Sequence, residues 1–384
     1  MEGEIMEMKY EDRQWVDAVW NKIDKKLQWV APQLKGKIPY TTSAKWHDRT
    51  VEGTYCDMRK LDVTWWTNGF WPGLMWLMYV GTKNDIYRTA AEDAEEILDE
   101  AFADYDHLHH DVGFMWHISS GVNYRLFGSH KSKVRTAIAA DILASRYNCE
   151  GKYIRAWNED KVGWVIIDCM MNINLLYWAS EEFKDPRFKY VAMNHADTVM
   201  RTHIREDGSS NHIVRLDPAN GDVIESYGGQ GYANGSSWSR GQSWAIYGYV
   251  LSYIHTGKKE YLDTAKKVAD YFIDCVKSDW LPRVDFRAPE EPVYYDSTAG
   301  AIASCGFIEL AKATGDTKYL DAALNILKAM EKNFCDWSED NQAMLLMGTE
   351  RYDDDAGRHI SIIYGDYFFT EAIYKLKGFD MLFW

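Results

Sequence analysis

Two aspartates in the sequence stand out as side chains that could perform acid–base chemistry. Asp168 lies in GWVIIDCMMNIN (163–174), one of the most apolar stretches of the chain, where an ionisable group needs a partner or a chemical role. Asp111 follows two histidines in HLHHDVGFMWHISS (107–120). Apolar surroundings and a second carboxylate nearby both raise the pKa of a carboxyl group. If both aspartates face one cavity, they predict the pair of carboxyl groups typical of sugar chemistry.

Each aspartate also has a purely structural interpretation. Asp111 would cap a helix that begins at Val112, and Asp168 would satisfy the end of a neighbouring helix. Trp164 and Asn172 lie four residues before and after Asp168, so a helix would place all three on one face. This stripe in an apolar segment favours a functional role for Asp168.

A third group of chemically useful residues lies in GGQGYANGSSWSRGQSW (228–244). Ser236, Arg240 and Trp244 are spaced four residues apart, which predicts one face of a helix. A guanidinium beside an indole suits a carboxylated sugar, because Arg pairs with the carboxylate while Trp stacks on the ring. The alternative is an ion pair between Arg240 and Glu225 or Asp222.

The histidines next to Asp111 raise the question of a metal site. H-x-H-x-D at 107–111 overlaps the H-x-H-x-D-H ligand motif of metallo-β-lactamase-like hydrolases, but the sixth position is Val112 and the flanking segments are helical in pattern. No HExxH pair occurs elsewhere. We therefore expect no metal and no cofactor, and we expect His107 and His109 to be structural residues of a loop.

Composition narrows the class of protein. The formal net charge of −15 argues against binding to nucleic acid or to an anionic membrane. The longest apolar run, 69–81, is too short to span a bilayer. The content of 17 Trp and 25 Tyr suits sugar rings, because these side chains combine an apolar face with a polar edge.

Two further features bear on the compartment. The first residues, MEGEIMEMKYEDRQW, contain no secretory leader pattern, which predicts a cytoplasmic protein, or a periplasmic one if a leader was removed. The six cysteines include no CxxC pair, so we expect buried free thiols.

The elements that must position these residues follow from an alternation of two kinds of segment. Amphipathic, charged segments predict helices with one solvated face: 11–27, 83–102, 129–147, 185–204, 258–276 and 316–334. Nearly uncharged, aromatic segments predict buried helices: 65–81, 111–128, 163–180, 236–257, 296–315 and 364–379. YLDTAKK (261–267) and YLDAALN (319–325) are the clearest repeat.

Six buried helices alternating with six amphipathic ones predict an all-α, double-walled (α/α)6 barrel that forms a single catalytic domain over 1–384. An open solenoid would need polar caps and a more regular period. The stretch 205–235 is too long for a simple turn and predicts a lid or a small strand pair over one end. The inner helices of such a ring all begin at one end, where their free N–H groups favour an anionic ligand. The polar residues at these starts are Asn68, Asp111, Asp168, Arg240, Asp296 and Asp366.

Several separated motifs, in order, carry a resemblance to a known family. They are TNGFWPGLMW (67–76), HHDVGFMW (109–116), IRAWN (154–158), GWVIIDCMMNINLLYWAS (163–180), GQGYANGSSWSRGQSWAIYGY (229–249) and YGDYFFTEAIYKL (364–376). With these motifs the chain resembles the unsaturated glucuronyl hydrolases of glycoside hydrolase family 88 over nearly its whole length. The resemblance implies an (α/α)6 barrel without a metal, acting on 4,5-unsaturated uronic acid at the non-reducing end of oligosaccharides cut by a polysaccharide lyase.

The resemblance also implies roles for individual residues. Asp168 matches the general acid/base and Asp111 the assisting aspartate. The matching substrate-contact positions are Trp71, His110, Trp157, His212, Gln230, Arg240, Trp244 and Tyr364. Relatives that prefer sulfated substrates carry a Ser-x-Lys motif, whereas this chain has Ser361-Ile362-Ile363, which argues against that preference.

Three alternatives remain open at this point. An unsaturated rhamnogalacturonyl hydrolase would share the barrel and the chemistry. A sugar 2-epimerase would need two histidines in the lumen, which His110 and His212 could supply. A non-catalytic helical carbohydrate-binding protein would leave the acid in VIIDCMM unexplained. For partners, we expect the oligosaccharide substrate alone, with the protein a monomer or a weak oligomer.

Overall fold

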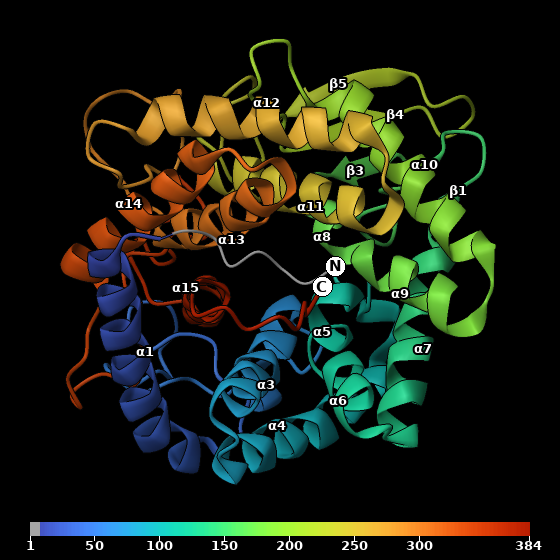
Figure 1. Cartoon of the computed structure of the whole chain (residues 1–384). Helices are drawn as coiled ribbons and strands as arrows, with labels where there is room; N and C mark the ends of the chain where they lie inside the picture. The colour runs from blue at the N-terminus through green and yellow to red at the C-terminus, as the bar shows by residue number, and fades with distance from the viewer. Residues whose placement is uncertain (1–7) are drawn as a thin grey trace.

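The computed structural model describes residues 8–384, which form two concentric rings of helices (Figure 1). The outer ring consists of α1 (Tyr10–Val30), α4 (Asp85–Leu98), α7 (His130–Ser145), α10 (Pro186–His203), α12 (Lys259–Val276) and α14 (Thr317–Phe334). The inner ring consists of α3 (Phe70–Thr82), α5 (Val112–Trp116) with α6 (Ser120–Phe127), α8 (Cys169–Asn172) with α9 (Asn174–Phe183), α11 (Ser239–Thr256), α13 (Ser297–Thr314) and α15 (Ile363–Leu376). The predicted (α/α)6 barrel is confirmed.

The burial of each ring follows its sequence pattern. Helix α13 is buried at every position from Ser297 to Ala311, as expected for a helix that is apolar on all sides. Helix α12 buries one stripe, which includes Tyr261, Ala265 and Phe272, and leaves its charged face in water. The inner helices therefore provide the core and the lumen, and the outer helices cover them.

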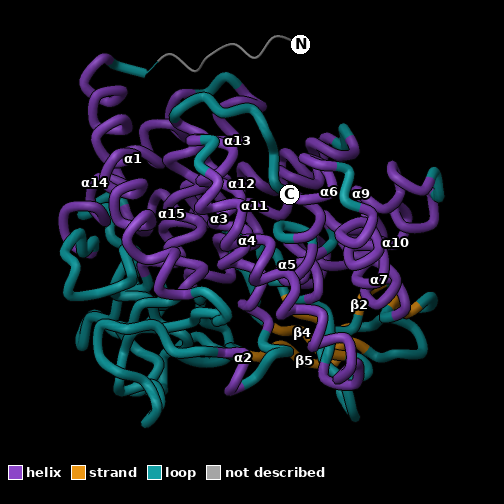
Figure 2. Tube along the Cα trace, turned by 90° about the horizontal axis from the view of Figure 1, so that it is seen from below, coloured by secondary structure: helices purple, strands orange, loops and turns teal. Residues whose placement is uncertain are grey.

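The connections between the rings are of two kinds. Each turn from an inner to an outer helix has two residues, at 83–84, 128–129, 184–185, 257–258 and 315–316. The first residue of each turn is in the left-handed conformation, which ends the helix abruptly. The connections that lead into the inner helices are long and contain the strands. Figure 2 shows the strands and the longest loops at one end of the barrel, so the inner helices begin at that end.

The strands form two small sheets. Strand β1 (Tyr147–Asn148) pairs with β2 (Tyr153–Ile154). Strands β3 (Trp164–Ile166), β4 (Ile213–Leu216) and β5 (Val223–Tyr227) form an antiparallel sheet in that order. The strand pair predicted within 205–235 is confirmed as β4 and β5. The helix predicted from 163 is wrong at its start, because the aromatic and β-branched residues of 164–166 pair with β4 instead.

The remaining short elements are α2 (Met58–Leu61) and the 3-10 helices η1 (Ala31–Leu34), η2 (Trp66–Gly69) and η3 (Asp99–His107). All six cysteines are free thiols. Contrary to expectation, Cys149 and Cys275 are exposed. In the described part of the chain, no helix has the length and apolar character needed to cross a membrane. The prediction about a leader concerns the first residues of the chain, and residues 1–7 of these lie outside the described residues.

Candidate active site

Asp111 is held at the start of inner helix α5 by a contact with the neighbouring inner helix. It occupies the N-cap position, yet its side chain makes no capping hydrogen bond. Instead its Oδ1 accepts a hydrogen bond from Asn172 Nδ2 at 3.0 Å, and Asn172 Oδ1 accepts one from the Phe114 N–H at 2.8 Å. A Cβ on Gly113 would lie 2.7 Å from the Asn172 Cα, so glycine permits this close approach of α5 and α8. The capping interpretation of Asp111 is thus wrong.

The electrostatic surroundings of Asp111 favour its protonated form. Its side chain is only 11% exposed, and burial raises its pKa well above the usual range, with a further rise from the charge of Asp168. The hydrogen bond from Asn172 and the positive charge of Arg146 act in the opposite direction. Burial therefore outweighs the single hydrogen bond, and the two aspartates interact electrostatically, as the sequence predicted.

Asp168 lies in the turn between β3 and α8, at the same end of the barrel. Its Oδ2 is buried and has no hydrogen-bond partner, and the facing group is His212 Nε2 at 3.4 Å. His212 directly precedes β4, and its ring packs on Trp238 with centroids 4.0 Å apart. Asp168 thus presents an uncommitted carboxyl oxygen next to an imidazole.

The tautomer of His212 is set by its second nitrogen. Nδ1 accepts a hydrogen bond from the Gln230 backbone N–H at 3.0 Å, while the Gly228 carbonyl lies farther away at 3.3 Å. An acceptor at Nδ1 places the proton of the neutral ring on Nε2. A Cβ on Gly229 would lie 2.1 Å from Nδ1, and this residue has φ +60°, so glycine is required here. His212 therefore directs an N–H toward Asp168.

The histidines before Asp111 also lie at the site. His110 donates from Nδ1 to the Ala156 carbonyl at 2.7 Å, and its Nε2 lies 3.2 Å from Asp111 Oδ1. His109 Nδ1 lies 3.4 Å from Asp111 Oδ2. Burial lowers the pKa of His109 to about 4 and that of His110 well below its usual value, so both rings are neutral. His109 therefore lies beside Asp111 in a loop, and its interpretation as a structural residue stays a prediction, whereas exposed His107 takes no part in this cluster.

Half-buried aromatic side chains continue outward from His110. The ring of Trp157 meets His110 edge-on at 5.9 Å, and Trp164 meets Trp157 at 6.1 Å. Trp164 stacks on Tyr227 with centroids 4.8 Å apart and planes 5° apart. The predicted helical stripe of Trp164, Asp168 and Asn172 is wrong in its geometry, because Trp164 is in a strand, but Asn172 does join the aspartates.

Arg240 is fully buried and has different partners from those predicted. Its guanidinium forms an ion pair with Asp296 and donates to the backbone carbonyls of Thr349 and Glu350. The alternative pair with Glu225 or Asp222 is therefore wrong. Ser236 lies outside α11, which begins at Ser239, so the predicted face of three residues is reduced to two.

Trp71 and Trp244 lie deeper than a stacking role would require. Trp71 is 1% exposed and Trp244 is 0% exposed, and Trp244 packs against Phe114 and Phe368. Half-buried Trp66, which the sequence did not single out, lies 5.1 Å from the ring of Tyr364 and 5.4 Å from that of Phe114. Trp65 and Trp66 are adjacent in WWTNG, and nothing in the sequence pattern indicates which of them lies next to Tyr364.

The other polar residues at inner-helix starts are satisfied within the protein. Asn68 donates to the carbonyls of Asp62 and Val63. Asp296 caps α13 and pairs with Arg240. Asp366 accepts from Tyr55 and from the Leu345 N–H. These three residues therefore stabilise the fold, and Asp111 and Asp168 remain as the acid–base candidates.

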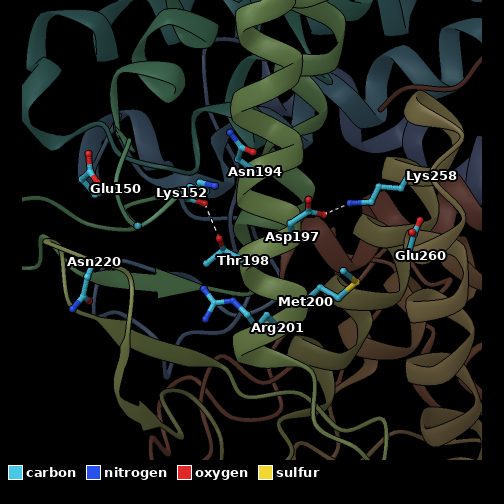
Figure 3. A pocket seen from close by; sticks show the side chains of 11 residues that line it. Glu150, Lys152, Asn194, Asp197, Thr198, Met200, Arg201, Asn220, Lys258 and Glu260 are labelled. Atoms are coloured by element: carbon cyan, nitrogen blue, oxygen red, sulfur yellow. Dashed lines mark hydrogen bonds and ion pairs between the residues drawn. The ribbon is translucent and has the colours of Figure 1, made fainter.

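A separate open pocket of about 650 Å³ lies on the outer wall, between α10, the start of α12 and the turn after β1. Figure 3 shows Asp197 paired with Lys258, and Thr198 hydrogen-bonded to the backbone of Lys152. Of its three acidic residues, Asp197 is paired with Lys258, and Glu150 and Glu260 are exposed. This pocket therefore differs from the aspartate site, where Asp168 offers a buried carboxyl oxygen without a hydrogen-bond partner.

Comparison with known proteins gives consistent relatives, although no protein-family model matches the chain. It is 33% identical over 328 residues to the unsaturated glucuronyl hydrolase of Bacillus sp. strain GL1, covering 82% of this chain and 87% of that protein. It is 32% identical to the unsaturated chondroitin disaccharide hydrolase of Streptococcus pneumoniae, over 96% of this chain and 94% of that one. A variant of unsaturated glucuronyl hydrolase from Streptococcus agalactiae, solved in complex with dGlcA-GalNAc6S, superposes with a TM-score of 0.80 at 26% identity over 100% of both chains.

Proposed function

This chain belongs to the unsaturated glucuronyl hydrolase family, and on that premise we propose that it is a glycoside hydrolase of 4,5-unsaturated uronic acids. Its substrates are oligosaccharides that a polysaccharide lyase has left with such a residue at the non-reducing end. Glycosaminoglycan fragments are the class supported by the relatives, whose names include chondroitin disaccharide hydrolases and one of which was solved with dGlcA-GalNAc6S. The proposal treats 1–384 as one catalytic domain that needs no cofactor and acts as a monomer or weak oligomer.

The observation that carries the proposal is the pair of buried aspartates at the loop-rich end of the barrel. Asp111 is held by Asn172, whereas Asp168 Oδ2 has no hydrogen-bond partner and faces only His212. An uncommitted carboxyl oxygen is what a general acid needs in order to reach a substrate atom. We assign the acid/base role to Asp168 and the assisting role to Asp111.

The reaction proceeds through hydration of a double bond. In the substrate, the C4=C5 bond and the ring oxygen form a vinyl ether. The proton of Asp168 goes to C4, and the electron pair of the double bond forms the new C–H bond, which leaves a cation shared by C5 and the ring oxygen. The ionised Asp168 then accepts a proton from water as the water oxygen bonds to C5. The resulting hemiketal opens and releases the remaining sugar, so one carboxyl group serves first as acid and then as base.

The second aspartate is coupled to the first. Two nearby carboxyl groups resist simultaneous ionisation, and burial raises the pKa of Asp111 well above its usual range, with a further rise from the charge of Asp168. The Asn172 hydrogen bond acts in the opposite direction and stabilises the ionised form of Asp111. We propose that this bond keeps Asp111 oriented to accept hydrogen bonds from the sugar hydroxyls while Asp168 acts on the double bond.

The remaining predicted residues receive roles according to their place in the structure. We propose that His110, His212 and Gln230 contact the unsaturated sugar, and that half-buried Trp157 stacks on a ring. Arg240 positions the loop at Glu350, because its guanidinium is committed to internal acceptors.

Three deeper aromatic residues, Trp71, Trp244 and Tyr364, are predicted substrate contacts that lie 1%, 0% and 1% exposed. We propose that they support the floor of the site. Half-buried Trp66, which touches Tyr364 and Phe114, is the better candidate to face a sugar ring.

The test is turnover of a panel of unsaturated disaccharides of chondroitin, hyaluronan, heparin, gellan and ulvan types, followed by loss of the ultraviolet absorbance of the unsaturated uronate. We expect absorbance loss with at least one substrate, and Asp168→Asn should lose nearly all turnover while still binding it. Unchanged absorbance across the panel would refute the function and favour an epimerase or a binding protein. Substantial turnover by Asp168→Asn would refute the assignment of the acid.

A further inference from the structure

Three consecutive residues, His109, His110 and Asp111, bring two imidazole nitrogens to one carboxyl group. The ligand atoms that they offer lie within 4.8 Å of one another. His109 Nδ1 is 3.4 Å from Asp111 Oδ2, and His110 Nε2 is 3.2 Å from Asp111 Oδ1. The sequence pattern H-x-H-x-D suggested His107 as a ligand and gave no reason to include His110. The backbone turn before α5 instead selects the two adjacent histidines.

The two facing nitrogens are free to act as electron-pair donors. Both His109 Nδ1 and His110 Nε2 are buried and have no hydrogen-bond partner, and the His110 side chain is only 2% exposed. His110 donates its Nδ1 proton to the Ala156 carbonyl, which leaves the lone pair on Nε2. A histidine that ligates a metal is commonly fixed by such a bond from its other nitrogen.

The distances suit a small tetrahedral ion. Nitrogen and oxygen ligands lie about 2.0–2.2 Å from Zn²⁺, so two ligands of a tetrahedral site are about 3.3–3.4 Å apart. The two nitrogen-to-oxygen distances, 3.4 and 3.2 Å, are of this size and end on different oxygens of Asp111, so both carboxylate oxygens would lie next to the ion. An imidazole lone pair that faces a carboxylate oxygen is repulsive unless a proton or a cation lies between them, and a metal ion supplies that cation.

The surrounding charges act in both directions. Asp168 acts on Asp111, and Asp62 acts on His109, both as negative charges. Arg146 opposes a cation, but its guanidinium is turned to the backbone carbonyls of residues 155–157 and to Asn158. Two imidazoles and one carboxylate favour Zn²⁺ over Mg²⁺ or Ca²⁺, which prefer oxygen ligands.

We propose that His109, His110 and Asp111 form a binding site for Zn²⁺ that inhibits the enzyme. The ion would occupy Asp111 and His110, to which the proposed function assigns work on the sugar, so Zn²⁺ and substrate compete. The inhibitory effect rests on the proposed function, whereas the binding of the ion does not. The fourth position of the tetrahedron is left for water.

The experiment is a calorimetric titration of the full chain with Zn²⁺ alone near neutral pH, for the wild type, His109→Ala and His107→Ala. His107 is the matched control, because it lies two residues earlier, is exposed and is not among the clustered ligands. Losing an outer-shell partner already weakens a metal site roughly 10–100-fold, so the loss of the His109 ligand should weaken Zn²⁺ binding at least tenfold. His107→Ala should bind as the wild type does, and Mg²⁺ should not compete.

Turnover measured on the same three proteins separates the two claims. Without metal, the turnover of each protein serves as its own reference, because His109 lies 3.4 Å from the assisting Asp111 and its replacement can itself lower turnover. Zn²⁺ should raise KM for the wild type and for His107→Ala, and much less for His109→Ala. Equal Zn²⁺ affinity of wild type and His109→Ala, or no binding, would overturn the site. If no protein turns over any substrate without metal, the proposed function fails while the titration still decides the site.

Discussion

Replacing Asn172 by Leu tests the electrostatic account of the aspartate pair. The two side chains have nearly the same shape, and Asn172 is fully buried. The variant removes the hydrogen bond to Asp111 Oδ1 at 3.0 Å and the acceptor of the Phe114 N–H at 2.8 Å. The first loss destabilises ionised Asp111 and removes the bond that orients it, so Asp111 is less able to accept hydrogen bonds from the sugar hydroxyls. The variant should therefore lose turnover.

The size of the effect follows from the charge on the acceptor. A hydrogen bond to a charged group contributes about 1.5–3 kcal/mol, and 1.36 kcal/mol corresponds to a factor of ten. The population with ionised Asp111, and with it kcat, should fall roughly 10- to 100-fold. The stranded Phe114 N–H should lower the free energy of unfolding by a further 1–3 kcal/mol or so, which urea denaturation measures independently of activity.

The matched control is Asn174→Leu, two residues along the same segment. Asn174 is equally buried but donates only to the carbonyls of Met170 and Met171. It should lose stability without a comparable loss of kcat, which is obtained from the rate of ultraviolet absorbance loss at saturating substrate. If folded Asn172→Leu shows the same kcat as Asn174→Leu, the account of Asp111 is wrong.

Three further predictions concern the framework of the site. Burial raises the pKa of Asp366 to about 6, so this carboxyl group holds its proton more tightly in the folded protein than in the unfolded chain. Its contribution to the free energy of unfolding is complete below about pH 4 and is lost as the pH rises through 6. Urea denaturation from pH 4 to 7 should show the wild type losing about 3 kcal/mol relative to Asp366→Asn, and parallel curves would contradict the shift. Lys375→Met removes the 2.6 Å partner of buried Glu309 and leaves it the more exposed Lys312 at 3.3 Å. The variant should cost up to about 3–5 kcal/mol, part of which Glu309→Gln should restore in denaturation experiments. Gly113→Ala places a Cβ 2.7 Å from the backbone of α8 and should cost about 1–3 kcal/mol as well as turnover, whereas Gly121→Ala, with its nearest neighbour at 3.4 Å, should leave both the melting temperature and turnover nearly unchanged.

The sequence predicts the barrel well because each ring has its own pattern. Buried helices are apolar on all sides and outer helices on one side, so twelve segments could be sorted without any knowledge of contacts. The strand β3 was missed because a short apolar run such as 164–166 fits either a helix or a strand, and its partner β4 lies almost fifty residues away. Local patterns cannot choose between these states when the deciding contact is distant.

The residues of the site likewise divide into those that the sequence could identify and those that it could not. Asp168 could be identified from the sequence, because burying a carboxyl group in an apolar run is costly unless it has a partner or a chemical role. The partner of Arg240 could not, because Asp296 lies 56 residues away and pairs with it only after α11 and α13 have packed together. Glu225 and Asp222 were closer in sequence but lie on β5 and its preceding turn. The role of His109 likewise depends on a backbone turn that spacing alone does not reveal.

Buried Arg240 is connected to the proposed acid Asp168 through a series of contacts. The Glu350 carbonyl accepts hydrogen bonds from Arg240 Nη2 at 2.6 Å and from Gln230 Nε2 at 2.7 Å. Gln230, thus anchored, donates its backbone N–H to His212 Nδ1, and this bond places the remaining ring proton on Nε2, which faces Asp168 Oδ2. An arginine whose guanidinium is bound to internal acceptors therefore fixes which nitrogen of His212 carries the proton opposite the proposed acid. Because the guanidinium also satisfies buried Asp296, its removal would leave a buried charge unpaired, so the same contacts couple the stability of α13 to the orientation of the site.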